Sequence, residues 1–394
     1  SAASDVYKRQ VGYKAAAPEG LSAILDAQNA SGRVSGPSAD NSHSVNMSVQ
    51  FDESAVMNAV NGLSCISGSD IVVTQDAHIT AYQEGTPFTI IPEVQGNNVD
   101  KDKAAALIKE AVKSGSSEVD LVASGCYVTV GVTAEDAALK DLCDTMNRCR
   151  DMVITYQFGE QTIKLEGETI CTWILGSTQD GLVDVNYDKA AAFVKSMADQ
   201  YDTAGKARAF HTTTGKDLNL TGPYGWQIDQ AGETASLIAM IRTGQSQLRE
   251  PLYSKKAQDR TTDWGKTYVE IDLTNQHVYM YQDGNLAWDA PCVTGNVSKN
   301  YTTPEGIYSL TYKQTDRVLR GEKKADGTYE YESHVDYWMP FNGGIGLHDA
   351  SWRSKFGGTI YQYGGSHGCI NLPSGKAQTL YDMVYTGIPV ICYN

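Results

Sequence analysis

His348, His367 and Cys369 are the residues near the C-terminal end of the chain whose types and spacing could do chemistry. A thiol near its ordinary pKa is only a few per cent thiolate at neutral pH, so a nucleophilic cysteine needs a base or a positive charge beside it. His367 precedes Cys369 by two residues, and on an extended segment both side chains would share one face. His348 ends a predicted strand at residues 344–348, and the fold could bring it back onto the thiol. This set predicts acyl transfer by a cysteine.

The backbone beside the candidate nucleophile could also take part in the reaction. Gly368 and Cys369 supply two consecutive N–H groups, which is what a tetrahedral oxyanion requires. Glycine also lets the backbone approach a reacting carbonyl closely. The alternative interpretation is that Cys369 packs as a small apolar residue while the two histidines serve structural roles.

Residues 366–371 resemble the Ser-His-Gly-Cys-x-Asn signature of bacterial L,D-transpeptidases, the enzymes that cross-link peptidoglycan. Here the signature is Ser366-His367-Gly368-Cys369-Ile370-Asn371. Other parts of the family pattern occur at residues 268–272, 293–295, 303–306, 337–341 and 387–390. The resemblance extends over residues 264–394. It implies that Cys369 is the nucleophile, that His348 is the catalytic base, and that the loop from Ser366 to Cys369 forms the oxyanion pocket.

The resemblance leaves open which group orients the imidazole. Asp349 stands where some family members have serine or glycine, so the partner could be a backbone carbonyl or the Asp349 carboxylate. Residues flanking the motif are candidates for substrate binding: Tyr337, Trp338, Trp352 and Arg353. Arg353 could bind a substrate carboxylate in bidentate geometry, or it could simply be a surface arginine over an aromatic ring.

Other chemistries fit these residues less well. Zinc could use both histidines and the cysteine, with Asp349 as a fourth ligand, but adjacent residues on one strand point in opposite directions, so His348 and Asp349 would not converge. The glycines at 343–346 lack the Lys-Ser/Thr pair of a phosphate-binding loop. We therefore expect no metal and no cofactor.

Length and charge restrict the class of protein. A chain of 394 residues is expected to form two or three domains. Its net charge of −15 opposes binding to nucleic acid or to anionic lipid. The sequence has no apolar run long enough to span a membrane. The chain begins at Ser1, so we expect a membrane connection only through an N-terminal anchor missing from this sequence.

The cysteines do not indicate a compact disulfide framework, because all eight are dispersed and none form a metal-binding pair. In an oxidising compartment, Cys126 could pair with Cys143, or Cys149 with Cys171. All of them could equally be buried thiols.

The region before the catalytic segment contains an internal repeat. Gly96, Asp100 and Gly115 recur at a constant offset as Gly225, Asp229 and Gly244, around a predicted helix in each copy. Chance similarity between two turn–helix units is the alternative. The two copies resemble the peptidoglycan-binding modules that precede this catalytic domain in many Gram-positive enzymes.

We therefore predict a multidomain protein, with two α+β modules before a mostly-β, sandwich-like catalytic domain that has one helix after the nucleophile. The predicted segments are a flexible stalk at 1–48, modules at 49–148 and 149–252, a polar linker at 253–265, and the catalytic domain at 266–394. Three aromatic residues of the second module could stack on sugar rings, although burial in the core is favoured: Phe210, Tyr224 and Trp226.

The resemblance implies an extracytoplasmic, cell-wall enzyme whose partners are the stem peptides and glycan of peptidoglycan. Its donor would be a tetrapeptide stem, its intermediate a Cys369 thioester, and its product a 3→3 cross-link. A carbapenem is expected to acylate the same thiol. The alternatives are an L,D-carboxypeptidase, in which water takes the acyl group, and a catalytically inert wall-binding scaffold.

Overall fold

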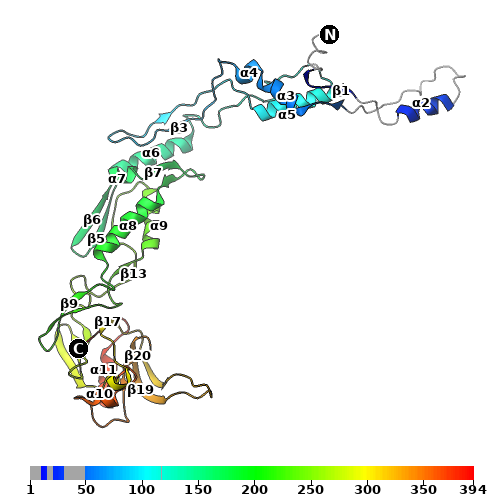
Figure 1. Cartoon of the computed structure of the whole chain (residues 1–394). Coiled ribbons are helices and arrows are strands. Elements are labelled where there is room, and N and C mark those ends of the chain that lie inside the picture. The colour runs from blue at the N-terminus through cyan, green and yellow to red at the C-terminus, as the bar shows by residue number, and fades with distance from the viewer. Residues whose placement is uncertain (1–9, 16–20, 31–48, 117) are drawn as a thin grey trace. The chain divides into compact units, whose positions relative to one another are not determined.

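The computed structural model describes residues 10–15, 21–30, 49–116 and 118–394 (Figure 1). Most of the predicted stalk at 1–48 lies outside the described residues. The chain divides into two compact units, Ser1–Asp144 and Thr145–Asn394. None of the helices in the described ranges is long and apolar enough to cross a membrane.

The first unit is built around a pair of helices. Each begins at an aspartate whose carboxylate accepts hydrogen bonds from first-turn N–H groups, Asp52 in α3 and Asp100 in α5. Val56 and Val60 of α3 and Ala104 of α5 are buried in the shared core. The elements are β1 Lys14–Ala15, α2 Leu21–Ala30, β2 Val49–Gln50, α3 Glu53–Asn61, α4 Ser64–Ser67, β3 His78–Ile79, β4 Ile90–Ile91 and α5 Lys101–Ser114; α6, Ala137–Asp151, spans the unit boundary.

The second unit starts with an α+β module. Its sheet has the strand order β12-β5-β6, and helices α8 and α9 pack against each other. The buried carboxylate of Glu233 in α9 accepts hydrogen bonds from the Tyr156 hydroxyl at 2.6 Å and from Arg249 at 2.9 Å, which ties the helix to the sheet. The elements are β5 Val153–Phe158, β6 Gln161–Glu166, α7 Gly167–Cys171, β7 Ile174–Ser177, β8 Val183–Val185, α8 Tyr187–Tyr201, β9 Arg208–His211, β10 Asp217–Leu220, β11 Gln227–Ile228, α9 Gln230–Ile241, β12 Gln247–Arg249 and β13 Tyr253–Lys255.

The two copies of the predicted repeat share local roles. Asp229 caps α9 as Asp100 caps α5. The glycines that follow the two helices, Gly115 and Gly244, have φ of 72° and 64°, in the left-handed region that glycine tolerates. The repeated residues therefore begin and end a helix in both copies.

The C-terminal part of the second unit consists of two sheets with a helix packed on their core. One sheet has the order β16-β15-β14-β22-β17 and the other β18-β19-β20-β21. Val269 of β14, Met339 of β19, Leu347 of β20 and Leu380 of α11 belong to one buried cluster. Burying each such side chain contributes about 1.5–3 kcal/mol. This core fixes the strands that carry the candidate site.

The elements of this part follow in chain order. They are β14 Tyr268–Asp272, β15 His277–Gln282, β16 Asn285–Pro291, η1 Val297–Lys299, β17 Gly306–Ser309, β18 Gln314–Arg320, β19 Glu332–Asn342, β20 Ile345–Asp349, α10 Ile360–Gly364, β21 Ile370–Leu372, α11 Ser374–Met383 and β22 Pro389–Tyr393.

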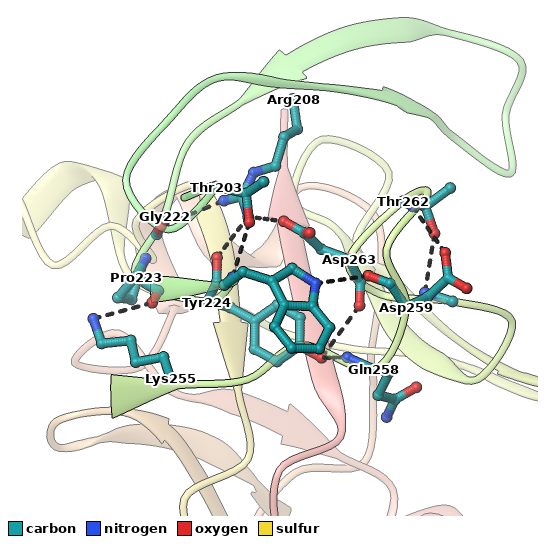
Figure 2. A network of polar contacts seen from close by, with 12 residues as sticks. Thr203, Arg208, Gly222, Pro223, Tyr224, Lys255, Gln258, Asp259, Thr262 and Asp263 are labelled. Carbon is teal, nitrogen blue, oxygen red and sulfur yellow. Dashed lines mark hydrogen bonds and ion pairs between the residues drawn. The ribbon is translucent and has the colours of Figure 1, made fainter. Parts of the chain in front are cut away.

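The segment predicted as a polar linker, 253–265, is structured and partly buried. Asp263 forms a 2.5 Å ion pair with Arg208, and the Tyr224 hydroxyl accepts a hydrogen bond from the Gln258 N–H at 3.0 Å (Figure 2). Trp264 of this segment packs in a cluster that joins the module to the catalytic strands. Asp263, one of the charged residues that suggested a linker, therefore forms an ion pair with Arg208 of the preceding module.

The same junction buries the aromatic residues considered for sugar stacking. Phe210, Tyr224 and Trp226 are only 2%, 7% and 9% exposed. They pack together with Ile307 and Tyr393 of the catalytic strands, as the core interpretation predicted. A sugar ring cannot reach them in this arrangement.

A buried carboxylate adds a polar contact to this junction. Glu270 of β14 is fully buried and accepts hydrogen bonds from the N–H and the hydroxyl of Thr213, both at 2.8 Å. Thr213 lies in the turn between β9 and β10. The hairpin tip of the module is therefore held against the catalytic sheet.

All eight cysteines are free thiols, and seven of them are buried, Cys65 being the half-buried exception.

Candidate active site

Strand pairing brings His348 and Cys369 onto one face of the smaller sheet. In the parallel pair β20–β21, His348 lies opposite Asn371. Side chains two residues apart on an extended chain share a face, so Cys369 lies on the same side as Asn371 and His348. Across the antiparallel pair β19–β20, Trp338 lies opposite His348. The candidate nucleophile and base are therefore diagonal neighbours.

A cavity of about 230 Å³ opens over these two groups. His348 is 3% exposed and Cys369 is 9% exposed, and both line this cavity. Its lining is Leu319, Tyr331, Ser333, His348, Trp352, Arg353, Gly365, Ser366, His367, Cys369 and Asn371. The predicted signature residues other than Gly368 thus line one cavity together with the candidate substrate-binding residues Trp352 and Arg353.

The histidine is oriented by a backbone group. Its Nδ1–H donates a hydrogen bond to the carbonyl oxygen of Asp349 at 2.7 Å, which leaves Nε2 with its lone pair available. Burial lowers the pKa of His348, although the hydrogen bond to the Asp349 carbonyl opposes the shift. His348 is therefore a neutral imidazole in the tautomer that a general base requires.

The Asp349 carboxylate has a different role. It accepts a hydrogen bond from the Tyr337 backbone N–H at 2.8 Å and so ties β19 to β20. Of the two groups that the sequence left open as the imidazole's partner, the carbonyl is the one in contact. Asp349 does not line the cavity.

The Cys369 thiol is protonated in this resting arrangement. Its Sγ donates a hydrogen bond to the Gly344 carbonyl oxygen at 3.5 Å. Burial raises the pKa of the thiol to about 11, and a contact with the Gly346 N–H opposes the shift. In this conformation the thiol donates to the Gly344 carbonyl and not to the imidazole.

Two hydroxyl groups hold the loop around the nucleophile. Ser366 Oγ donates to the Cys369 carbonyl at 2.6 Å and accepts from the Gly368 N–H at 3.0 Å. Thr303 Oγ1 donates to the Gly368 carbonyl at 2.7 Å. Gly368 has φ of 119°, a backbone conformation that other residues rarely adopt. Hydrogen bonds therefore fix the whole Gly368–Cys369 peptide.

This arrangement modifies the expected pair of oxyanion donors. The Gly368 N–H is occupied by Ser366 Oγ. Within the described chain, no acceptor is found for the Cys369 N–H. In this conformation only the Cys369 N–H is thus available to bind an oxyanion.

His367 has an environment unlike that of His348. Its ring lies 4.4 Å from the Tyr301 ring and 4.6 Å from the Tyr331 ring, and its Nε2 lies 3.6 Å from a Glu330 carboxylate oxygen. The side chain is 38% exposed. His367 therefore forms part of the cavity wall, held between aromatic rings.

Two residues that line this cavity have buried polar atoms without partners. Arg353 Nε and Asn371 Oδ1 are buried and lack a hydrogen-bond partner among the described residues. Both residues line the cavity, and Trp352, which is 51% exposed, lies beside the His348 ring at 5.9 Å. Leaving such atoms unpaired costs free energy, which a polar ligand would recover.

Tyr337 and Trp338, considered for substrate binding, lie behind the cavity wall. Trp338 is 4% exposed and packs against Cys369, and its indole N–H donates to the Tyr312 hydroxyl at 3.2 Å. Tyr337 packs against Tyr381 with ring centroids 5.3 Å apart. Both side chains therefore support the strands that carry the site.

Sequence reasoning missed three residues of the cavity. Leu319, Tyr331 and Ser333 come from β18, β19 and the segment between them. Their residue types carry no chemical signal, and only the pairing of β18 with β19 places them here. No group of histidine, cysteine and acidic residues able to hold a metal ion is found in the described ranges.

Comparisons with known proteins show what the chain is similar to. Residues 266–392 match the YkuD family model, an L,D-transpeptidase catalytic domain, and residues 142–249 match a model described as "Putative peptidoglycan binding domain". A structure of the Ldtfm–avibactam carbamoyl enzyme is 32% identical, with 65% of this chain and 99% of that chain covered and a TM-score of 0.54.

A second solved structure is similar to the same extent. A cysteine-to-serine mutant of the Enterococcus faecium L,D-transpeptidase is 31% identical, with 64% of this chain and 100% of that chain covered and a TM-score of 0.53. Comparison with curated proteins gave no match.

Proposed function

This chain belongs to the L,D-transpeptidase family, as the signature around Cys369 predicted, and from this premise we propose that it forms 3→3 cross-links in peptidoglycan through a Cys369 thioester. The observation that carries the proposal is the placement of His348 and Cys369 on one sheet face, at the floor of one cavity. A protonated thiol next to a neutral imidazole suits a reaction in which substrate binding starts the proton transfer.

The first half of the reaction acylates the enzyme. His348 Nε2 takes the thiol proton, and Sγ attacks the carbonyl carbon of the third residue in a tetrapeptide stem. The Cys369 N–H stabilises the oxyanion of the tetrahedral intermediate. The C–N bond to the D-residue then breaks, and the leaving amine takes the proton from the imidazolium.

The second half transfers the acyl group. The side-chain amine of a neighbouring stem attacks the thioester carbonyl, and His348 accepts the proton that this amine loses. The C–S bond breaks, and the sulfur recovers a proton from the imidazolium. The thioester keeps the free energy of the cleaved amide bond, so no nucleotide is consumed.

Arg353 and Trp352 are the proposed substrate-binding residues. The Arg353 guanidinium lines the cavity with an unpaired Nε, and a donor stem ends in a carboxylate that pairs well with a guanidinium. Trp352 offers a half-exposed aromatic face beside His348. Together they would hold the D-residue that leaves.

The module at 149–252 is proposed to hold the enzyme on peptidoglycan, because residues 142–249 match the domain described for that role. The repeat of capped helices extends the proposal to the module at 49–148. Binding of this kind places the protein outside the cytoplasm, at the cell wall.

Product analysis tests the proposal. The purified protein is incubated with a disaccharide-tetrapeptide, and the products are identified by mass spectrometry. Cross-linked dimers are expected, and they should disappear in Cys369→Ala but persist in Cys65→Ala, which removes a half-buried thiol of the first unit. Tripeptide without dimers would make the protein an L,D-carboxypeptidase. Unchanged substrate would indicate an inert wall-binding scaffold.

A further inference from the structure

We propose that Thr303 is a positioning residue for the oxyanion site, because it fixes the direction in which the Cys369 N–H points. Thr303 lies far from the signature loop in the sequence, yet its hydroxyl donates to the Gly368 carbonyl at 2.7 Å. The inference rests on the proposed acyl transfer at Cys369 and adds to it a residue that never touches the reacting atoms.

The argument follows from the geometry of a peptide unit. The Gly368 carbonyl and the Cys369 N–H belong to the same planar group, in which the C=O and N–H bonds point in opposite directions. Holding the carbonyl oxygen therefore also sets the direction of the N–H. Ser366 Oγ holds the groups on either side, the Gly368 N–H and the Cys369 carbonyl. Within the peptide unit itself, the hydrogen bond found among the described residues is the one from Thr303 to the Gly368 carbonyl, and Gly368, with φ of 119° and no side chain, restrains the unit little.

Thr303 is itself firmly placed. It is 7% exposed, and its Oγ1 accepts a hydrogen bond from the Gly295 N–H at 3.1 Å while donating to Gly368. Gly295 lies so close to the neighbouring backbone that an added Cβ would stand 1.8 Å from the Tyr301 carbonyl oxygen. The Thr303 hydroxyl thus links the tightly packed backbone at Gly295 to the Gly368–Cys369 peptide by two hydrogen bonds.

Hydrogen bonds in series also polarise one another. A donor on the Gly368 carbonyl draws electron density through the amide and makes the Cys369 N–H a stronger donor. Since the Gly368 N–H is occupied by Ser366, the Cys369 N–H is the amide on which oxyanion stabilisation depends before any loop movement. Removing one oxyanion donor typically lowers the rate about 100- to 1000-fold, so weakening it should lower the rate by somewhat less.

The test compares two reactions of the same thiol in Thr303→Val and Thr303→Ser. In acylation by a carbapenem, Sγ attacks the lactam carbonyl, an oxyanion forms, and the ring C–N bond breaks while the ring nitrogen takes the proton. In alkylation by iodoacetamide, Sγ displaces iodide and no oxyanion forms. Acylation is followed by intact mass, and alkylation by peptide mass spectrometry of Cys369.

Thr303→Val keeps the shape of the side chain without its hydroxyl and is expected to acylate about 30- to 300-fold more slowly. Its alkylation should stay within about threefold of wild type, and Thr303→Ser should recover most of the acylation rate. With the disaccharide-tetrapeptide, the loss should appear in kcat rather than in KM. Thr303→Ala gives the same comparison if the valine variant does not fold.

Two results would overturn the inference. Acylation at the wild-type rate in Thr303→Val would show that the hydroxyl does not set the oxyanion donor. An equal fall in both reactions would show that Thr303 acts on the thiol or on the fold. If wild-type protein is alkylated but never acylated, the proposed acyl transfer is wrong, and this inference is wrong with it.

Discussion

The reactivity of the resting Cys369 thiol can be calculated from its surroundings. Burial raises the pKa of this thiol from its ordinary value to about 11, so its thiolate fraction at pH 7 is about 10⁻⁴ instead of about 10⁻². The more basic thiolate is intrinsically about 6- to 10-fold more nucleophilic, for a Brønsted slope of about 0.4–0.5. We therefore expect the Cys369 thiol to react about 10- to 15-fold more slowly than an ordinary thiol. Restricted access of the reagent to the buried sulfur would slow it further.

The assay is the rate of reaction with a small aromatic disulfide from pH 6 to pH 10, measured on the Cys369 peptide by mass spectrometry. Because the thiol stays largely protonated throughout, the rate should rise about tenfold for each pH unit over the whole range. A free cysteine peptide should level off near pH 8.5 under the same conditions. Circular dichroism at each pH checks that the protein remains folded.

His348→Ala distinguishes the intrinsic reactivity of the resting thiol from its base-assisted reactivity in acylation. The thiol donates to the Gly344 carbonyl and not to the imidazole, so the pH profile of the disulfide reaction should be nearly unchanged in this variant. Carbapenem acylation, which needs the base, should fall about 100- to 10000-fold. A wild-type rate that levels off between pH 6 and pH 8 would reveal a thiolate–imidazolium pair and refute the reasoning.

Three further substitutions test other contacts. Asp349→Asn should leave carbapenem acylation within about tenfold of wild type, because the backbone carbonyl, and not the carboxylate, contacts the imidazole. Gly368→Ala should lower acylation by at least about 100-fold, because φ is 119° and the new Cβ would meet Ile345 at 3.1 Å. Asp263→Asn leaves the Arg208 guanidinium without a charged partner and should cost about 3 kcal/mol in unfolding free energy. Urea unfolding followed by tryptophan fluorescence measures this cost, because all six tryptophans lie in the second unit.

The identity of the chemistry could be predicted from sequence because its signals are local. Ser366 to Asn371 form one continuous loop and strand, so the motif indicates the family and a candidate nucleophile without knowledge of the fold. The helix caps at Asp100 and Asp229 are local in the same way, since each side chain bonds only to the turn that follows it. The aromatic residues around Trp226 were expected in the core, where large apolar rings stabilise most.

Other features depend on contacts between residues distant in the sequence. The linker interpretation relied on the charge of residues 253–265, and charge does not show that Asp263 meets Arg208 in a buried junction. The cavity walls at Leu319 and Tyr331 follow from the pairing of β18 with β19, which leaves no mark in residue type.

The sequence alone determined which groups are candidates for the reaction, because the proposed nucleophile, base and loop glycine are recognisable by type and order. The tertiary structure decided how they are held: that the Asp349 carbonyl orients His348, that the Gly344 carbonyl accepts a hydrogen bond from the Cys369 thiol, and that Thr303 Oγ1 donates to the Gly368 carbonyl. The physical reason is that a hydrogen bond depends on distance and direction. Strand register and backbone packing fix both, and neither is encoded in any single stretch of chain.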